Sequence, residues 1–307
     1  MKLSAAPDLN TASLEGPAKI SVAVACAVLA LKTVAWRVTD SVALGSDAME
    51  SIVNVAAALA MWAAVRVAKR PPDADHPFGH GKAEYLSAVL EGVLVLVAAV
   101  EIAREALPRV LHPRVAESLG LGVAFSVGAS ALNGALGLYL LRAGKRSRSP
   151  ALHADGVHVL TDVATSAGVL VGIGLARLTG WWTLDAILAL IVAAQIVWAG
   201  FGLVRRSVGG LMDETLDPEE SAALRALIDA KARERGAVEV HGFRMRSAGS
   251  GIFCDLHLVV PGAMTVSAAH ALCDDVERAV EQAHPHVDVT IHVEPESLAE
   301  RTATAVV

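Results

Sequence analysis

Six polar residues that could bind a metal cation form two matched sets, each inside an apolar stretch of the chain. The sets are Asp47, Glu50 and Asn54, and Asp155, His158 and Asp162. In both sets the residues stand at relative positions 0, +3 and +7. Successive residues of a helix turn by about 100°, so each set shares one helix face. Two such helices facing each other would surround one divalent cation with carboxylate, amide and imidazole groups.

Polar residues inside a membrane are costly, at about 2.5–3.5 kcal/mol for an Asp at a helix centre. A single residue such as Asn54 is more simply explained as a hydrogen-bonding link between helices. The repetition of the pattern instead favours a metal site, and His and carboxylate groups suit tetrahedral Zn²⁺. The predicted transport-site ligands are Glu50, Asn54, His158 and Asp162. Asp47 and Asp155 lie one turn earlier, so we expect them to cap a helix or to support the ligands.

The composition indicates a membrane protein with a soluble part. Of the 307 residues, 54% are hydrophobic and 19% are charged, against about 25% charged in soluble domains. Six apolar segments approach the about 20 residues that a membrane-spanning helix needs. We place them at 17–36, 43–67, 84–106, 116–141, 152–176 and 182–204. No cleavable signal peptide is expected ahead of them.

After about residue 210 the chain becomes charged and shows the patterning of a soluble α+β domain. The expected order is a helix at 217–235, strands at 237–247 and 252–260, a helix at 266–283 and a strand at 287–293. The sequence thus predicts an α-helical membrane protein with six transmembrane helices and a C-terminal cytoplasmic α+β domain. The expected parts are a tail at 1–16, the membrane domain at 17–207, the cytoplasmic domain at 208–300 and a tail at 301–307.

Lys and Arg residues near the helix ends predict the orientation in the membrane. The loops on the side of residues 69–82 and 142–148 carry most of them, and the cytoplasmic side is usually the positive one. Arg104, Arg109 and Arg114 oppose this bias. We expect a multi-pass protein of a cell membrane, the inner membrane of a bacterium, with both termini in the cytoplasm.

Two further groups of residues could bind metal. The loop after the second apolar segment carries Asp73, His76 and His80, although a solvated polar loop explains this spacing equally well. The soluble domain carries His241, His257, His270, Asp274, His292 and Glu294, which converge only if the strands pair as expected. Ordinary surface histidines are the alternative there. The three cysteines show no metal-binding or disulfide spacing.

Three polar residues inside the apolar segments belong to neither matched set: Lys32, Glu91 and Asn133. Glu91 is expected to pair with Lys32 or to face the path of the metal.

The string His76-Pro-Phe-Gly-His80-Gly-Lys82-Ala-Glu84 and the pair His158 and Asp162 resemble motifs of the cation diffusion facilitator family, proton-coupled exporters of divalent metals. The resemblance spans about residues 17–296. It implies a homodimer of six-helix units with metallochaperone-like, ferredoxin-like cytoplasmic domains. It also implies metal ligands at His241, His257, His270, Asp274 and His292, with Glu294 where some members carry Asp. Lys82 and Asp213 are assigned supporting or gating roles.

One departure from the family pattern concerns the second-helix ligands. Well-known zinc exporters carry Asp or His followed by Asp, whereas this chain has Glu50 and Asn54. The quartet therefore holds at most two carboxylates. Zn²⁺ is the foremost candidate, and Fe²⁺, Mn²⁺, Co²⁺, Ni²⁺ and Cd²⁺ stay open, because geometry and availability decide selectivity in cells.

The predicted function is proton-coupled efflux of divalent cations from the cytoplasm by alternating access, without enzymatic chemistry. The expected partners are the metal substrate, protons, the lipid bilayer and a second copy of the chain, and not nucleic acid. A metal importer or channel is the first alternative, which the proton dependence of flux would distinguish. A metal-dependent membrane hydrolase is the second, although the chain has no HExxH motif.

Overall fold

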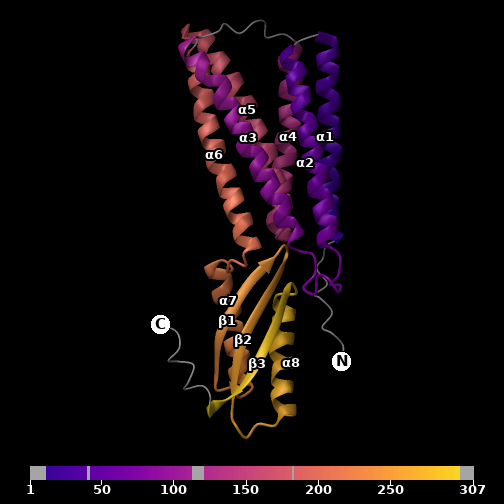
Figure 1. Ribbon diagram of the computed structural model, residues 1–307, viewed down its shortest axis with the longest axis vertical. Helices are drawn as coiled ribbons and strands as arrows, with labels where there is room; N and C mark the ends of the chain where they lie inside the picture. The colour runs from indigo at the N-terminus through magenta and orange to yellow at the C-terminus, as the bar shows by residue number, and fades with distance from the viewer. Residues whose placement is uncertain (1–11, 40–41, 113–120, 182, 298–307) are drawn as a thin grey trace. The chain divides into compact units, whose positions relative to one another are not determined.

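A computed structural model describes residues 12–39, 42–112, 121–181 and 183–297 (Figure 1). The chain divides into two compact units. One comprises Thr11–Arg70 and Lys82–Val208, and the other contains Pro71–Gly81 together with Gly209–Val307. The loop that carries Asp73, His76 and His80 therefore belongs to the same unit as the C-terminal domain.

The first unit consists of long helices that run side by side (Figure 1). Their bounds are α1 Ala12–Thr39, α2 Val42–Ala68, α3 Ala83–Leu111, α4 Leu121–Ser147, α5 Pro150–Thr179 and α6 Thr183–Leu211. Helix α5 packs against α4 and α3 and also contacts α1 and α2. Residues of α5 can therefore interact with side chains from four other helices.

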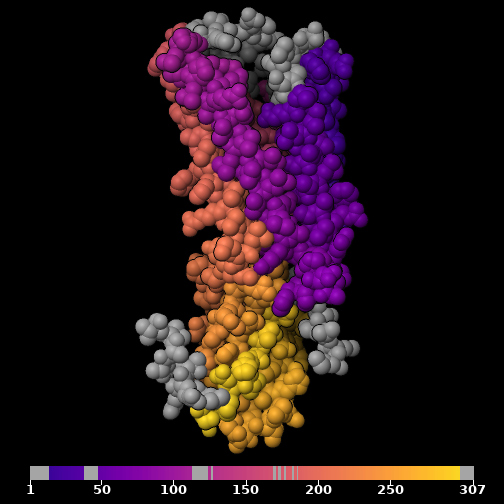
Figure 2. Space-filling model, in the orientation of Figure 1, coloured from indigo at the N-terminus to yellow at the C-terminus, as the bar shows by residue number. Residues whose placement is uncertain are grey.

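Four of these helices, within the described residues, are long and apolar enough to cross a membrane. The stretches are Leu14–Arg37, Ala48–Ala68, Ala83–Leu111 and Ala186–Leu211. On the face shown in Figure 2, the surface of this unit is formed largely by α1, α2, α3 and α6. Large apolar side chains such as Trp198 and Val100 are exposed on these helices, as expected for a lipid-facing surface. For α4 and α5, membrane spanning stays a prediction, and residues 116–120 of the fourth predicted segment lie outside the described part.

Helices α4 and α5 approach closely because small residues face each other. A Cβ atom on Gly137 would meet the Leu160 side chain at 2.7 Å, and one on Gly156 would meet the Leu141 backbone nitrogen at 3.0 Å. Such small-residue contacts are typical of helix pairs in membranes. They fix the position of α5, and so of His158 and Asp162 further along it.

Helix α5 is also held at its start. The Ser149 hydroxyl accepts a hydrogen bond from the Leu152 amide at 3.2 Å, as an N-cap residue does. The same hydroxyl donates to the buried carboxylate of Glu84 on α3. Glu84, the last residue of the loop motif, thereby links the starts of α3 and α5.

The C-terminal domain is a two-layer α+β fold in the predicted order. Its elements are α7 Pro218–Glu234, β1 Glu239–Ala248, β2 Gly251–Val260, α8 Val266–Ala283 and β3 Val287–Pro295. The sheet order is β1-β2-β3, with β1 and β2 antiparallel and β2 and β3 parallel. Leu224 and Ile228 of α7, Val276 and Val280 of α8 and alternate residues of the strands form one core. Both helices therefore cover the same face of the sheet, and the fold prediction is confirmed.

A β-bulge interrupts the pairing of β1 with β2. The pairing of β1 with β2 shifts between His241 and Arg244, and Gly242 in the bulge has a φ of +64°, which glycine adopts without steric cost. The ring of His257 lies 3.3 Å from where a Gly242 Cβ would be. The bulge thus leaves room for an imidazole beside the backbone of β1.

Candidate metal-binding sites

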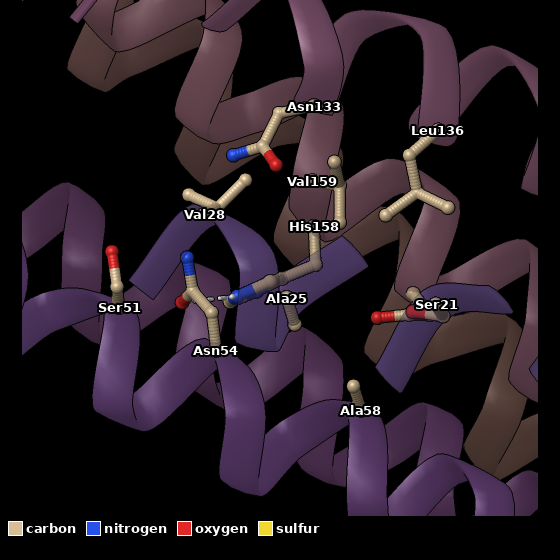
Figure 3. A pocket seen from close by; sticks show the side chains of 11 residues that line it. Ser21, Ala25, Val28, Ser51, Asn54, Ala58, Asn133, Leu136, His158 and Val159 are labelled. Carbon is tan, nitrogen blue, oxygen red and sulfur yellow. Dashed lines mark hydrogen bonds between the residues drawn. The ribbon is translucent and has the colours of Figure 1, made fainter. Parts of the chain in front are cut away.

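Three of the four predicted transport-site residues meet between α2 and α5. The Asn54 amide Nδ2 donates to Asp162 Oδ2 at 2.6 Å, and His158 Nε2 lies 3.2 Å from Asn54 Oδ1. Figure 3 shows the His158 ring pointing toward Asn54. Ligands at about 2.0–2.2 Å from a tetrahedral Zn²⁺ are separated by about 3.3–3.6 Å. The His158 and Asn54 atoms already stand near that spacing.

A small cavity opens beside these residues (Figure 3). Its volume is about 10 Å³, and its polar lining comes from four helices: Ser21 of α1, Ser51 and Asn54 of α2, Asn133 of α4, and Asp155 and His158 of α5. A cavity of roughly this size holds one water molecule, so a bare cation also fits. Asn133, which belongs to neither matched set in the sequence, is the polar residue that α4 contributes to this lining.

Asp155 supports the cavity from one turn earlier on α5. Its side chain is buried and accepts a hydrogen bond from the Ser21 hydroxyl at 2.5 Å. It is therefore tied to α1. The charges of Asp155 and Glu50 both act on His158.

Glu50 differs from these three residues in its exposure to solvent. It is exposed on α2, while Asn54 and Asp162 bond to each other. The Asp47 side chain lies outside the described residues. The structure thus assembles Asn54, His158 and Asp162 and leaves Glu50 at their edge.

Glu91 is a polar residue at this site whose role sequence reasoning left open. It lies on α3 and is fully buried, and its Oε2 stands 3.6 Å from His158 Nδ1. Neither carboxylate oxygen has a hydrogen-bond partner in the described part of the chain. The contact of Glu91 with His158 supports the expectation that Glu91 faces the path of the metal, rather than the expectation that it pairs with Lys32.

The loop residues Asp73, His76 and His80 form a compact group whose ligand atoms lie within 4.8 Å of one another. Asp73 Oδ1 accepts hydrogen bonds from the backbone amides of Asp75 at 3.1 Å and His76 at 2.7 Å, the pattern of an Asx-turn. Its other oxygen lies 3.3 Å from His80 Nε2. The amide hydrogen bond from His76, together with the nearby imidazoles, lowers the pKa of the Asp73 carboxyl. The turn therefore presents an ionised carboxylate to both imidazoles.

The same loop packs on the sheet of the C-terminal domain. The ring of Phe78 meets that of Phe253 edge to face at 5.7 Å, and the Arg246 guanidinium lies over both rings. Asp213, at a φ of +60°, accepts a hydrogen bond from Arg246 at 3.1 Å. Asp213 thus orients the arginine that holds the loop. Lys82 is the residue before α3 and belongs to the six-helix unit.

The cytoplasmic histidines form a row across the sheet. His241 pairs with His257 across β1 and β2, and His257 pairs with His292 across β2 and β3. Glu294 follows two residues after His292 and so shares its sheet face. Its carboxylate lies 3.0 Å from His257 Nδ1 and 3.5 Å from His241 Nε2.

The side chains of this row are incompletely hydrogen-bonded. Both ring nitrogens of His241, Nδ1 of His257 and one oxygen of Glu294 are buried without a hydrogen-bond partner in the described residues. Buried polar atoms without partners are rare in folded proteins, and a divalent cation could take one ligand atom each from His241, His257 and Glu294, which lie within 4.8 Å of one another. His292 stands at the edge of the group, 3.8 Å from Glu294. His270 and Asp274 form a separate exposed pair on α8.

The cysteines of this domain do not take part. Burial and the charge of Asp255 raise the pKa of Cys254 to about 12, and burial also raises that of Cys273. Both therefore remain neutral thiols, and it is the thiolate that binds metal.

A bundle of apolar helices with a buried His and partly buried Asn and Asp beside it, joined to an α+β domain with its own histidine cluster, defines a multi-pass membrane transporter of divalent cations. The sequence profile of the cation efflux transmembrane domain matches residues 18–212, and that of the cytoplasmic domain of cation efflux proteins matches residues 216–296. The chain belongs to the cation diffusion facilitator family, as the motifs predicted.

Relatives match along almost the whole chain. An uncharacterized transporter of Synechocystis sp. is 42% identical over 286 residues, 93% of this chain and 92% of that protein. The cation-efflux pump FieF of Shewanella oneidensis is 31% identical, over 90% of this chain and 92% of that protein. The metal-bound C-terminal domain of the CzcD transporter from Thermotoga maritima is 28% identical over 26% of this chain and 94% of that one, with a TM-score of 0.24.

The loop group should lose metal on acidification because its histidines become charged. Asp73, with its lowered pKa, stays ionised at any pH above about 4, whereas histidines ordinarily titrate near about 6.5. We expect Zn²⁺ binding by this loop to fall between about pH 7 and pH 5.5. Calorimetric titration of full-length protein carrying Asp162→Ala and Glu294→Ala would measure it. Asp73→Asn should weaken binding without moving the midpoint, and a midpoint near pH 4 would contradict the assignment.

Proposed function

We propose that this protein exports divalent transition-metal cations, Zn²⁺ foremost, from the cytoplasm in exchange for protons by alternating access. The observation that carries the proposal is the group formed by the buried His158 with the half-buried Asn54 and Asp162, joined at 2.6 and 3.2 Å between α2 and α5. Polar and ionisable groups inside membrane helices mark ion pathways. Glu50 completes the quartet when its side chain turns inward.

Exchange for protons follows from the ligand chemistry. Metal binding requires a neutral imidazole and ionised carboxylates, so it releases protons. In the described state the Asn54 amide is hydrogen-bonded to both His158 and Asp162, and these hydrogen bonds open when a cation takes the same atoms as ligands. Return of protons to His158 and the carboxylates would eject the metal on the far side. Histidine suits this exchange because its ordinary pKa of about 6.5 lies near working pH.

The ligand types favour Zn²⁺ and leave other metals open. The quartet offers one imidazole nitrogen and oxygens from Glu50, Asn54 and Asp162, with at most two negative charges. Tetrahedral Zn²⁺ accepts nitrogen and oxygen donors at similar distances. Fe²⁺, Mn²⁺, Co²⁺, Ni²⁺ and Cd²⁺ are the alternative substrates, and the neutral amide of Asn54 is the group that distinguishes them.

The other two sites regulate or feed transport in this proposal. The loop triad Asp73, His76 and His80 is exposed and binds metal transiently. The row of His241, His257 and His292 with Glu294 binds metal in the cytoplasmic domain and stabilises a homodimer, to which His270 and Asp274 contribute. Asp47, Asp155, Lys82 and Asp213 support or gate these sites. The membrane domain is residues 17–207, the cytoplasmic domain is residues 208–300, and both termini lie in the cytoplasm of a bacterial inner membrane protein.

The decisive experiment is flux in proteoliposomes with a panel of divalent metals under an imposed pH gradient. Asp162→Ala should abolish transport and leave a folded, inserted protein, because a membrane helix loses a costly charge and the site loses a ligand. The matched control is Glu101→Ala, which removes an exposed carboxylate of α3 that pairs with Arg104 one turn along the same helix. Normal flux in Asp162→Ala would refute the site.

A second prediction concerns selectivity. Asn54→Asp adds a charge and removes the amide that donates to Asp162. All divalent cations gain electrostatic attraction, but the changed geometry favours some over others. We expect the order of preference in a competition transport assay to change. An unchanged order with uniformly higher affinity would show that Asn54 does not tune selectivity.

A third prediction concerns the cytoplasmic domain, whose core is formed by its own helices and strands. Residues 208–300 expressed alone should dimerise and gain thermal stability from Zn²⁺. Binding only to the folded state adds about 2.7 kcal/mol at a hundredfold excess over the dissociation constant. Replacing His257 and His292 together by Ala should remove the gain, and His284→Ala should keep it. A melting temperature indifferent to Zn²⁺ in the unmodified domain would contradict the site.

A further inference from the structure

Two buried polar groups, the carboxylate of Glu91 and the Nδ1 atom of His158, face each other between α3 and α5. Glu91 is 0% exposed, and its Oε2 lies 3.6 Å from His158 Nδ1. Both Glu91 oxygens and His158 Nδ1 lack hydrogen-bond partners in the described part of the chain. A buried polar atom without a partner costs about 1–3 kcal/mol. Three such atoms in one place indicate that the pair has a use.

Apolar residues flank Glu91 along its own helix, while the carboxylates of Asp155 and Asp162 on α5 also act on it. Along α3 it lies between Ala88, which packs with Ala154 and Leu203, and Val95, which packs with Ala99 and Ile196. Helix α3 is held close to α6, because a Cβ on the next residue, Gly92, would meet the Val204 side chain at 2.6 Å. Since Asp155 and Asp162 are carboxylates and repel that of Glu91, the imidazole of His158 on α5 is the favourable polar contact described here.

The two nitrogens of the His158 ring point in different directions. Nε2 faces Asn54 Oδ1 at 3.2 Å, where the cation would bind, and Nδ1 faces Glu91. A cation at Nε2 therefore lies on the side of the ring away from Glu91, so Glu91 is not placed as a further ligand of that cation. Histidines that bind metal through one nitrogen nearly always donate the other N–H to a carboxylate, carbonyl or water.

We infer that Glu91 is a positioning residue of the cation-bound transport site: when a cation replaces the contact of Nε2 with Asn54 Oδ1, the imidazole proton is on Nδ1 and the Glu91 carboxylate accepts it, so that the Nε2 lone pair binds the cation. This inference rests on the proposed function of His158. The present 3.6 Å separation must shorten to about 2.7–3.2 Å for a hydrogen bond, which a small rotation of the imidazole provides because its χ2 angle is soft. A cation on Nε2 polarises the Nδ1–H and strengthens this bond.

The test measures KM and kcat for Zn²⁺ in proteoliposomes with three variants. Glu91→Met removes the acceptor at nearly the same length and should raise KM about 10- to 100-fold, the usual effect of losing such a partner. Its melting temperature in detergent should equal or exceed that of the unmodified protein, because a costly buried polar group is removed. Glu91→Gln retains an acceptor oxygen and should show a smaller rise in KM. The matched control, Ser87→Ala, removes a buried hydroxyl one turn earlier on α3 and should leave KM unchanged.

A second measurement shows whether Glu91 acts through His158. Full-length protein carrying Asp73→Ala and Glu294→Ala retains only the transport site, and its Zn²⁺ dissociation constant is measured by calorimetry. Glu91→Met should weaken binding in this background and have no further effect once His158→Ala is present.

Three results would overturn the inference. The first is an unchanged KM in Glu91→Met. If Glu91→Met does not insert into the membrane, the second is a KM in Glu91→Gln as low as in the unmodified protein. The third is that Glu91→Met weakens Zn²⁺ binding equally whether or not His158 is present. If Glu91→Met transports normally while Asp162→Ala does not, the inference fails and the proposed function stands. If the unmodified protein moves no metal, the proposed function itself fails.

Discussion

The hydrogen bonding of Asn54 is the interaction on which the helical unit depends, because it lets polar groups remain buried among apolar helices. One amide serves two neighbours: it donates to Asp162 and faces the imidazole nitrogen of His158. The amide thus hydrogen-bonds a carboxylate and an imidazole that lie between α2 and α5. The same arrangement keeps the two groups close enough to bind one cation. In the proposed site, stability without metal and affinity for metal would therefore arise from the same three side chains.

The three candidate sites reach their geometry by different means. Between the helices, small-residue contacts of α4 with α5 set the position of His158, and the Glu84 and Ser149 bond holds the start of α5. In the loop, backbone amides orient Asp73 before any metal arrives. In the cytoplasmic domain, strand register places three histidines in a row, and the Gly242 bulge makes room for the middle one.

Periodicity explains why the sequence predicted so much of this arrangement. A repeat of 0, +3 and +7 assigns residues to one helix face, and so Asn54, His158 and Asp162 were placed together; alternation in strands did the same for His292 and Glu294. The role of Glu91 could not be found in this way, because its contact with His158 depends on how α3 packs on α5. Spacing also does not show that Glu50 is exposed or that Phe78 packs under Arg246. The separation of His270 and Asp274 from the row of histidines likewise depends on how α8 packs.

The three candidate sites differ in their exposure to water, and this difference affects how firmly each could hold a cation. In the loop, Asp73 and His76 keep 51% and 58% of their side-chain surface exposed, so a cation there retains much of its hydration and both binds and leaves readily. In the cytoplasmic row, His241 and Glu294 are 16% and 13% exposed, and several of their polar atoms have no hydrogen-bond partner within the described residues. Between the helices, His158 is 5% exposed, and a cation must give up nearly all of its water. Charged groups in such a place interact strongly, since little solvent screens them. A dry site can therefore hold its cation firmly in one protonation state and expel it in another, which a wet site cannot do, and this difference is what suits the helical site to drive transport.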